Sequence, residues 1–263
     1  MPAPVLPSDR QGESIWICPP VKPLTKQETN TAELLYSSIA GLKMQPAGPP
    51  GVAGLELRVA LMLLQDDSGL APADNDFWRA KCSALFLRPA LEPIACSYWP
   101  RLAAFDMDTA AALHVASAMA GRPLVYRKGP ATGRSVKGDV GFEPLPKARR
   151  WLADIRAAAA DPTLRLALPA YAFARTLMAH PFSDGNGRFA RLMVHAALAR
   201  SAGLDRPLLA LAPACYRRGR ALGEALTLLG ESGDWRPFNA LFLSLLGEAM
   251  ALAKAFAETA RGE

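Results

Sequence analysis

A mainly helical fold with one small β-hairpin is the prediction that the sequence supports, and three observations favour it. Apolar residues recur at helical spacing through most of the 263 residues, in stretches rich in alanine and leucine. Proline- and glycine-rich segments such as Met44–Gly54 separate these stretches. The best strand candidate is a single segment, Pro123–Arg127, with a glycine-spaced return before Phe142.

The N-terminal part of the chain is predicted to be an extended arm followed by helices. Prolines punctuate residues 1–24, which we expect to be extended, with Trp16 docking on the folded part. The segment Thr29–Leu42 is predicted to be a helix because its apolar residues share one face. The sequence further predicts helices at Leu55–Leu64, Asp76–Leu87 and Asp108–Ala120, and an irregular stretch at Pro89–Arg101.

The charge of the chain is basic but dispersed. The net charge is +6 and the isoelectric point is near 9.3. The densest cationic stretch is Arg122–Arg150, yet no zinc-finger spacing or clear helix-turn-helix accompanies it. Nucleic acid is therefore not the favoured partner, and a positive rim that steers an anionic substrate explains the charge as well.

Cysteine usage and hydropathy favour a cytoplasmic protein with no membrane association. The four cysteines are scattered and form no Cys-x-x-Cys pair, as is typical of reduced intracellular thiols. The N-terminus lacks the basic-then-apolar run of a secretory signal. No window approaches eighteen uninterrupted apolar residues.

The densest chemistry of the chain lies in the run from His180 to Arg191, His-Pro-Phe-Ser-Asp-Gly-Asn-Gly-Arg-Phe-Ala-Arg. Its two glycines, Gly185 and Gly187, can adopt positive φ without steric cost, so the backbone can form a concave turn of inward amides. The following residues, 188–203, are predicted to be a helix. The turn would then lie at a helix N-terminus, where free N–H groups and the dipole favour an anion.

The side chains of this run suit a nucleotide phosphate. Arg188 and Arg191 are three residues apart, hence neighbours on one helix face, and two guanidinium forks suit a polyphosphate. Asp184 is a hard oxygen ligand of the kind that Mg²⁺ uses together with substrate phosphates. His180 is the natural general base near neutral pH. Together they suggest attack by a hydroxyl on a nucleotide phosphate.

This run resembles the signature of the Fic family, H-x-F-x-[D/E]-G-N-G-R-x-x-R, with every fixed position filled. The resemblance extends over about residues 100–246 and includes Gly121–Arg127 upstream. It implies a Fic-type helical bundle with a small β-hairpin flap near the active site. It also divides the chain into a 1–54 extension with a helix, a 55–99 helical lead-in packed on the core, a 100–246 Fic domain and a 247–263 C-terminal helix or tail.

The resemblance implies a protein adenylyltransferase, a nucleotidyltransferase that moves AMP from ATP to a Ser, Thr or Tyr hydroxyl of a target protein and releases pyrophosphate. His180 would be the catalytic base, and Asp184 would hold Mg²⁺. The nucleotide would be bound by Gly185, Asn186, Gly187, Arg188 and Arg191, with Asn186 on the α-phosphate and the arginines on the β and γ phosphates. Phe182 would anchor the loop in the core.

The resemblance also implies protein partners. The flap, about residues 125–142, would hold the target segment by main-chain pairing beside the active site. Many family members carry an inhibitory glutamate that pairs with the second motif arginine, here Arg191, but no segment of this chain matches that pattern well. A separate inhibitory protein, a cryptic glutamate such as Glu33, and an unrestrained enzyme all stay open.

Two alternatives to AMP transfer remain. Relatives of this fold move UMP, phosphocholine or phosphate, although the phosphate-transferring branch usually has lysine where Gly187 stands. A non-catalytic protein-binding module is the other alternative, and the intact motif argues against it. His195 has no place in the motif and is predicted to be a packed or hydrogen-bonded histidine.

Overall fold

The computed structural model describes residues 14–41, 92–135, 138–203, 209 and 211–262, and it confirms a mainly helical fold with a small sheet. Its centre is a pair of antiparallel helices, α8 (Leu168–Ala179) and α9 (Asn186–Ala202). Every residue of α8 except Leu177 is buried. A helix apolar on all sides belongs inside a bundle, so the other elements surround this pair.

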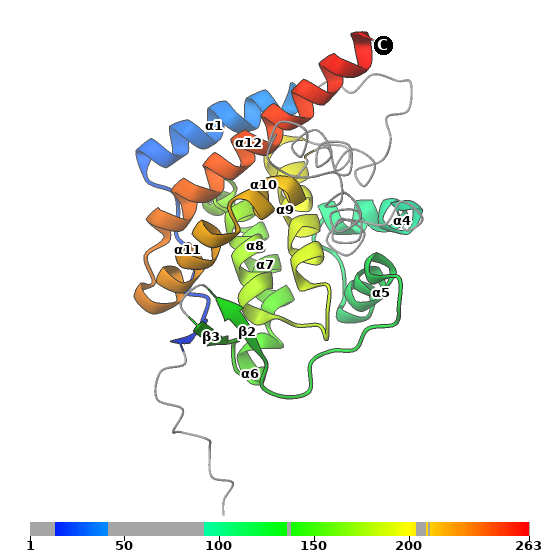
Figure 1. Ribbon diagram of the computed structural model, residues 1–263, viewed down its shortest axis with the longest axis vertical. Helices are drawn as coiled ribbons and strands as arrows, with labels where there is room; N and C mark the ends of the chain where they lie inside the picture. The colour runs from blue at the N-terminus through cyan, green and yellow to red at the C-terminus, as the bar shows by residue number, and fades with distance from the viewer. Residues whose placement is uncertain (1–13, 42–91, 136–137, 204–208, 210, 263) are drawn as a thin grey trace, which may run out of the picture.

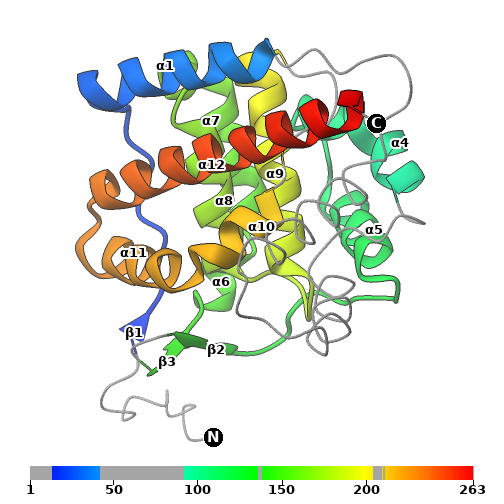
Figure 2. The same cartoon turned by 45° about the horizontal axis from the view of Figure 1, so that its top comes forward.

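The surrounding helices cover the central pair from several sides. In both views α1 and α12 cross one end of α8 and α9, while the sheet lies at the other end (Figures 1 and 2). Helices α4 and α5 pack beside α9. The bounds are α1 Lys26–Ala40, α4 Glu92–Ala103, α5 Thr109–Ala120, α6 Leu145–Ala148, α7 Trp151–Ala160, α10 Leu211–Arg217, α11 Gly219–Ser232 and α12 Trp235–Gly262, with a 3₁₀ turn at Pro162–Leu164.

Most of the predicted helices that fall on described residues are present. Helix α1 begins one turn earlier than predicted because Thr25 and Glu28 form a reciprocal capping box. Helix α5 begins after the N-cap Asp108 and ends at Gly121, which has φ 68°. The predicted helices at 55–64 and 76–87 lie outside the described residues.

The prediction of an irregular stretch at Pro89–Arg101 was wrong, because α4 occupies Glu92–Ala103. Its two prolines do not prevent the helix. Pro93 lies in the first turn, where the missing N–H would have no intrahelical acceptor. Pro100 lies near the C-terminal end, and its carbonyl still accepts a hydrogen bond from the Ala104 N–H at 3.0 Å.

The sheet contains three strands in the order β1 (Ser14–Ile15), β3 (Gly138–Gly141), β2 (Thr132–Ser135). Strands β2 and β3 form the expected antiparallel hairpin, with Gly133 opposite Val140. Strand β1 adds in parallel, which the sequence did not indicate, and Trp16 docks behind it with 8% of its surface exposed.

The strand predicted at Pro123–Arg127 is not part of this sheet. The segment instead pairs with the motif loop through one antiparallel bridge, between Tyr126 and Phe182. The Ser183 N–H donates to the Val125 carbonyl and the Arg127 N–H donates to the Pro181 carbonyl, both at 2.9 Å. The segment is extended, as predicted, but its partner is the candidate site itself.

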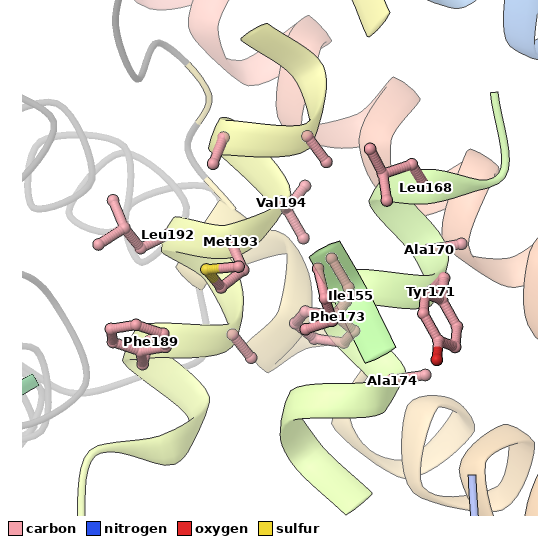
Figure 3. Close-up of a cluster of buried hydrophobic side chains, with 14 of the residues drawn as sticks. Ile155, Leu168, Ala170, Tyr171, Phe173, Ala174, Phe189, Leu192, Met193 and Val194 are labelled. Carbon is pink, nitrogen blue, oxygen red and sulfur yellow. The ribbon is translucent and has the colours of Figure 1, made fainter. Parts of the chain in front are cut away.

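An aromatic core fixes the position of the motif loop. Phe182 is 1% exposed and contacts the rings of Trp151, Tyr126 and Phe189 at centroid distances of 5.9, 5.3 and 5.1 Å. Figure 3 shows the neighbouring apolar side chains of α8 and α9 together with Ile155. The side chain of Phe182 therefore anchors the loop between these helices in the core.

None of the described helices combines the length and hydropathy that crossing a membrane requires.

Candidate active site

His180 lies at the C-terminal end of α8 in a strained backbone conformation. Its φ is 44° and its ψ is 58°, in the left-handed region that non-glycine residues seldom adopt. Its N–H still donates to the Thr176 carbonyl at 3.1 Å, so it closes the last turn of the helix. Such strain persists only where neighbouring groups hold it, and it turns the chain sharply toward the motif loop.

Arg127 holds this strained helix end. Its guanidinium donates to the carbonyls of His180 (3.1 Å) and Ala179 (2.9 Å). These carbonyls are at the end of α8, where no N–H of the same helix can donate to them. The same group donates to the carbonyls of Glu143 (2.6 Å) and Gly129 (3.2 Å). Arg127 thus joins the end of α8 to both ends of the hairpin segment.

Phe142 supports the imidazole of His180 from one face. The two rings stack with centroids 3.8 Å apart and an interplanar angle of 15°. Gly133, on the opposite hairpin strand, approaches the Phe142 ring so closely that a Cβ there would lie 2.8 Å from its Cζ. Trp16 contacts the same ring edge-on at 5.9 Å, and its indole N–H donates to Thr227.

The imidazole of His180 is neutral near pH 7. Burial lowers its pKa from 6.5 to about 4, and the positive charge of Arg127 acts in the same direction. The Leu177 carbonyl and the Asp184 carboxylate oppose this shift without overcoming it. Among the described residues, the buried Nδ1 has no partner that satisfies hydrogen-bond geometry. A neutral ring has one unprotonated nitrogen, which a general base requires.

The motif turn opens α9 as an anion-binding helix N-terminus. Gly185 has φ 74° and is the N-cap, and the first intrahelical bond runs from the Phe189 N–H to its carbonyl at 3.0 Å. The N–H groups of Asn186 and Gly187 precede this bond and have no acceptor within the helix. Gly187 is already helical, so of the two glycines only Gly185 adopts the positive φ that the turn requires.

The side chain of Asn186 closes the motif loop from within. Its Oδ1 accepts from the Phe182 N–H and its Nδ2 donates to the Phe182 carbonyl, both at 2.9 Å. The residue is 3% exposed. The side chain of Asn186 is therefore engaged in hydrogen bonds within the loop. Its backbone N–H is the group that belongs to the anion-binding N-terminus of α9.

The two motif arginines occupy one face of α9. Arg188 is 9% exposed, and its Nη1 donates to the Met119 carbonyl of α5 at 3.2 Å. Arg191 is half-buried, and its Nη1 lies 3.7 Å from where a Cβ on Gly187 would be. The lack of a side chain at residue 187 therefore keeps the space beside Arg191 open.

Asp184 is held by two hydrogen bonds and one longer ion pair. Its Oδ2 lies 2.7 Å from Arg122 Nη2 and 3.7 Å from Arg188 Nη2, and its Oδ1 accepts from the Gly185 N–H at 2.6 Å. Burial raises the pKa of Asp184, but the hydrogen bond from Arg122 and then those other donors outweigh it and lower the pKa overall. Asp184 is therefore an anion that already carries a cationic partner.

The donor set fits Mg²⁺ only if a substrate completes the coordination shell. No group of three His, Cys, Asp or Glu side chains that could hold a metal occurs in the described part of the chain. A single ionised, half-exposed carboxylate is what Mg²⁺ uses when phosphate oxygens and water supply the other ligands.

A buried ion network lies behind the site. Glu143 is fully buried, and its carboxylate accepts from Arg175 Nη1 at 2.6 Å and from the Cys18 N–H at 2.8 Å. Arg175 also donates to Asp154 at 2.9 and 3.1 Å. The network joins the N-terminal arm, the base of the hairpin, α7 and α8.

His195 is a structural residue, as predicted. It is 2% exposed, and its Nε2 accepts from the Leu209 N–H at 3.2 Å. Its Nδ1 lies 3.0 Å from the Arg191 carbonyl, so the proton of the neutral ring is on Nδ1. Burial lowers its pKa to about 4. The ring links α9 to the segment before α10.

Glu33 lies at the wrong end of α9 to reach Arg191. It lines a hollow with Arg165 and Ser201, near the C-terminal end of α9. Ten residues of helix separate Ser201 from Arg191, a rise of roughly 15 Å. In the described arrangement Glu33 is therefore not the inhibitory glutamate.

The structure thus brings the predicted residues His180, Asp184, Gly185, Asn186, Gly187, Arg188 and Arg191 to one end of the α8–α9 pair. Three further residues lie there for which no individual role was predicted: Arg122, and, from the predicted flap, Arg127 and Phe142. Both arginines belong to the segment that resembles the family: Arg122 directly precedes the strand candidate and Arg127 is its last residue. Their place in that segment was the available signal. No sequence signal pointed to the stack of Phe142 on His180.

Comparison with known proteins identifies the class. Residues 106–198 match the model of the Fic/DOC family. A Fic family protein from Desulfovibrio desulfuricans G20 has a similar fold, with a TM-score of 0.63 and 15% identity over 92% of this chain and 78% of that one. A Fic domain containing signaling protein from Bacteroides thetaiotaomicron VPI-5482 matches with a TM-score of 0.49 and 14% identity, over 86% of this chain and 97% of that one. No protein with a curated description matches the sequence.

The fold and the helix N-terminal turn together define a Fic-type domain. The part of the chain that matches the Fic/DOC family, residues 106–198, contains the whole run from His180 to Arg191. Members of this family are generally transferases that move phosphate-containing groups to proteins.

Proposed function

We propose that the protein transfers AMP from ATP to a Ser, Thr or Tyr hydroxyl of a target protein. The observation that carries the proposal is the position of a neutral His180 at the end of α8, four residues before Asp184 and six before the first residue of α9. This arrangement places a base, an anion-binding turn and two arginines at the junction of α8 and α9.

In the proposed reaction His180 accepts the proton of the target hydroxyl as its oxygen attacks the α-phosphorus of ATP. A P–O bond forms to the target, the bond to the β-phosphate oxygen breaks, and pyrophosphate leaves. A base with a pKa near 4 is weak, but the negative charge of a bound triphosphate favours the imidazolium and raises that pKa. The imidazolium then releases its proton to water.

The phosphates would be held by α9. The N–H groups of Asn186 and Gly187 and the helix dipole would bind one phosphate, and the guanidinium groups of Arg188 and Arg191 the others. Asp184 would hold Mg²⁺, which when bound neutralises charge on the phosphates. Arg122 would have to leave Asp184 for that ligand to become available.

The target segment is proposed to bind along the hairpin. Strand β3 pairs with β1 on one side and β2 on the other, so β2 has an edge without a partner strand among the described residues. An extended peptide can add to such an edge by main-chain hydrogen bonds. The stack of Phe142 on His180 would then place the base directly beside the docked segment.

A separate protein that presents a glutamate to Arg191 remains a proposed inhibitor.

The test is the fate of the label in ATP. The purified protein is incubated with a lysate and ATP labelled at the α or the γ position, beside His180→Ala and the control His114→Ala, which removes a histidine of α5. We expect protein label from the α position only, lost in His180→Ala and kept in the control. Label from the γ position alone would indicate phosphate transfer, and absence of label with ATP, UTP and CDP-choline would indicate a non-catalytic module.

A further inference from the structure

A second cavity, separate from the motif turn, lies beside the segment that pairs with the motif loop. It has a volume of about 410 Å³ and is bounded by Val125–Lys128, by α6 and the start of α7, and by Pro181. A volume in this range is typical of sites that bind a small ligand or an inserted side chain. No residue to which we assign a role with ATP lines it.

We propose that this cavity, the docking pocket, binds an acidic and apolar segment of the target protein. The proposal rests on the proposed function to the extent that the acceptor is a protein. The expected occupant is a large apolar side chain with Asp or Glu neighbours, on the same chain as the modified hydroxyl.

The apolar half of the proposal rests on the lining of the pocket. Val125, Leu145, Trp151 and Pro181 contribute to it. Val125 is 55% exposed, one of the few large apolar side chains of the described residues left open to solvent. Covering such a surface is favourable by about 25 cal/mol per Å² of apolar area removed from water.

The acidic half rests on charge complementarity. Lys128 and Arg149 line the pocket, both are exposed, and neither forms an ion pair with any described residue. None of the described residues that line the pocket is acidic. The neighbouring cations are already engaged: Lys147 lies 4.0 Å from Glu143, and Arg150 lies 3.8 Å from Asp154.

The number of cations and the concave shape favour a peptide over a larger polyanion. Binding of an acidic membrane surface commonly uses clusters of four to eight basic residues, and nucleic acid likewise calls for an extended basic stripe. Two unpaired cations at the edge of a hollow suit one or two carboxylates beside an inserted side chain.

The position of the pocket fits a role in choosing the target. Pro181 follows His180 directly, and Val125 and Arg127 are hydrogen-bonded to the motif loop. Lys128 precedes β2 by only four residues. A target segment that pairs with β2 could therefore extend into the pocket within a few residues of the modified hydroxyl.

The experiment selects ligands without assuming a reaction. A display library of random twelve-residue peptides is selected on the full-length protein, and enriched peptides are labelled with fluorescein for anisotropy. We expect a large apolar residue flanked by Asp or Glu. Binding should weaken about tenfold or more in Lys128→Glu/Arg149→Glu and in Val125→Asp. The matched charge control Lys26→Glu/Lys254→Glu, on exposed residues of α1 and α12, should bind as the wild type does.

His180→Ala should bind the peptides unchanged, so failure of the AMP-transfer proposal would not affect this result. The docking proposal is overturned if no peptide is enriched or if the enriched peptides are not acidic. It is equally overturned if they bind the Lys128→Glu/Arg149→Glu variant as tightly as the wild type, or if inorganic phosphate binds at these residues while peptides do not.

Discussion

The ring of Phe142 lies flat against the imidazole of His180, with 3.8 Å between the ring centroids. Phe142 follows β3 directly, so the hairpin proposed to bind the target also sets the orientation of the proposed base. This contact makes the flap part of the catalytic geometry.

Two glycines of the same segment test this coupling. In Gly133→Ala the new Cβ would lie 2.8 Å from the edge of the Phe142 ring, so the ring must shift relative to His180 or the hairpin must give, whereas nothing lies within 4 Å of a Cβ at Gly129. We expect kcat for AMP transfer to fall about tenfold to a hundredfold in Gly133→Ala, as misplacement of a reacting group does. Gly129→Ala should retain the wild-type kcat. Equal rates for the two variants would show that the stack does not position the base.

Arg127 should act as a positioning residue for His180. Lysine cannot reproduce a guanidinium fork that reaches four carbonyls. In Arg127→Lys we expect kcat to fall about tenfold or more with little change in KM for ATP, because the proposed phosphate ligands belong to α9.

Arg156→Lys is the matched control for Arg127→Lys, since Arg156 similarly donates to the carbonyls of Phe105 (3.1 Å) and Met107 (2.7 Å). Comparable losses of Tm with a loss of kcat only in Arg127→Lys would support the positioning role. A similar loss of kcat in both would reduce Arg127 to general structural support.

The stability of the protein should fall as the pH falls from about 6.5 toward 4. His180 and His195 both have pKa values near 4 in the folded state and 6.5 as the usual value. In this window the unfolded chain binds more protons than the folded one, so the free energy of unfolding rises with pH. Each histidine contributes up to about 1.4 kcal/mol per pH unit.

Urea unfolding between pH 4.5 and 6 measures this slope. His180→Asn removes one of the two titrations and should lower the slope by about the contribution of one histidine. An unchanged slope in that variant would mean that His180 is not shifted as its burial implies.

Arg122 should compete with a metal ion for Asp184. Because its Nη2 lies 2.7 Å from Asp184 Oδ2, Arg122→Gln removes a cation that the metal must displace. Both side chains are about half-exposed, so we expect only about two- to fivefold tighter binding of Mn²⁺ in the presence of ATP, followed by electron paramagnetic resonance. Asp184→Asn should abolish that binding. Weaker binding in Arg122→Gln would instead place Arg122 on the phosphates.

The candidate site was predictable from the sequence where its residues are contiguous. From His180 to Arg191 the local rules for glycine turns and helix N-termini suffice, and the predicted helix after the turn is α9. The sequence also located the hairpin, through its glycines, although the segment Pro123–Arg127 pairs with the motif loop instead.

The remaining features depend on contacts between distant segments. Arg175 lies 32 residues from Glu143, and Cys18 lies 125 residues from it, so no local pattern reveals their network. The parallel pairing of Ser14 with Val140 and the stack of Phe142 on His180 have the same origin. Helix α4 was not predicted for a local reason. Its two prolines suggested an irregular segment, but they lie near the ends of the helix, where proline is tolerated.

The most direct test of the central proposal is the mass of the modified target. A lysate treated with the protein and unlabelled ATP is digested and analysed by tandem mass spectrometry, beside the same lysate treated with His180→Ala. We predict peptides that carry one AMP group on a Ser, Thr or Tyr hydroxyl with the wild type and none with the variant. A phosphate, UMP or phosphocholine group on those side chains, or the same AMP-bearing peptides with His180→Ala, would contradict the proposed reaction.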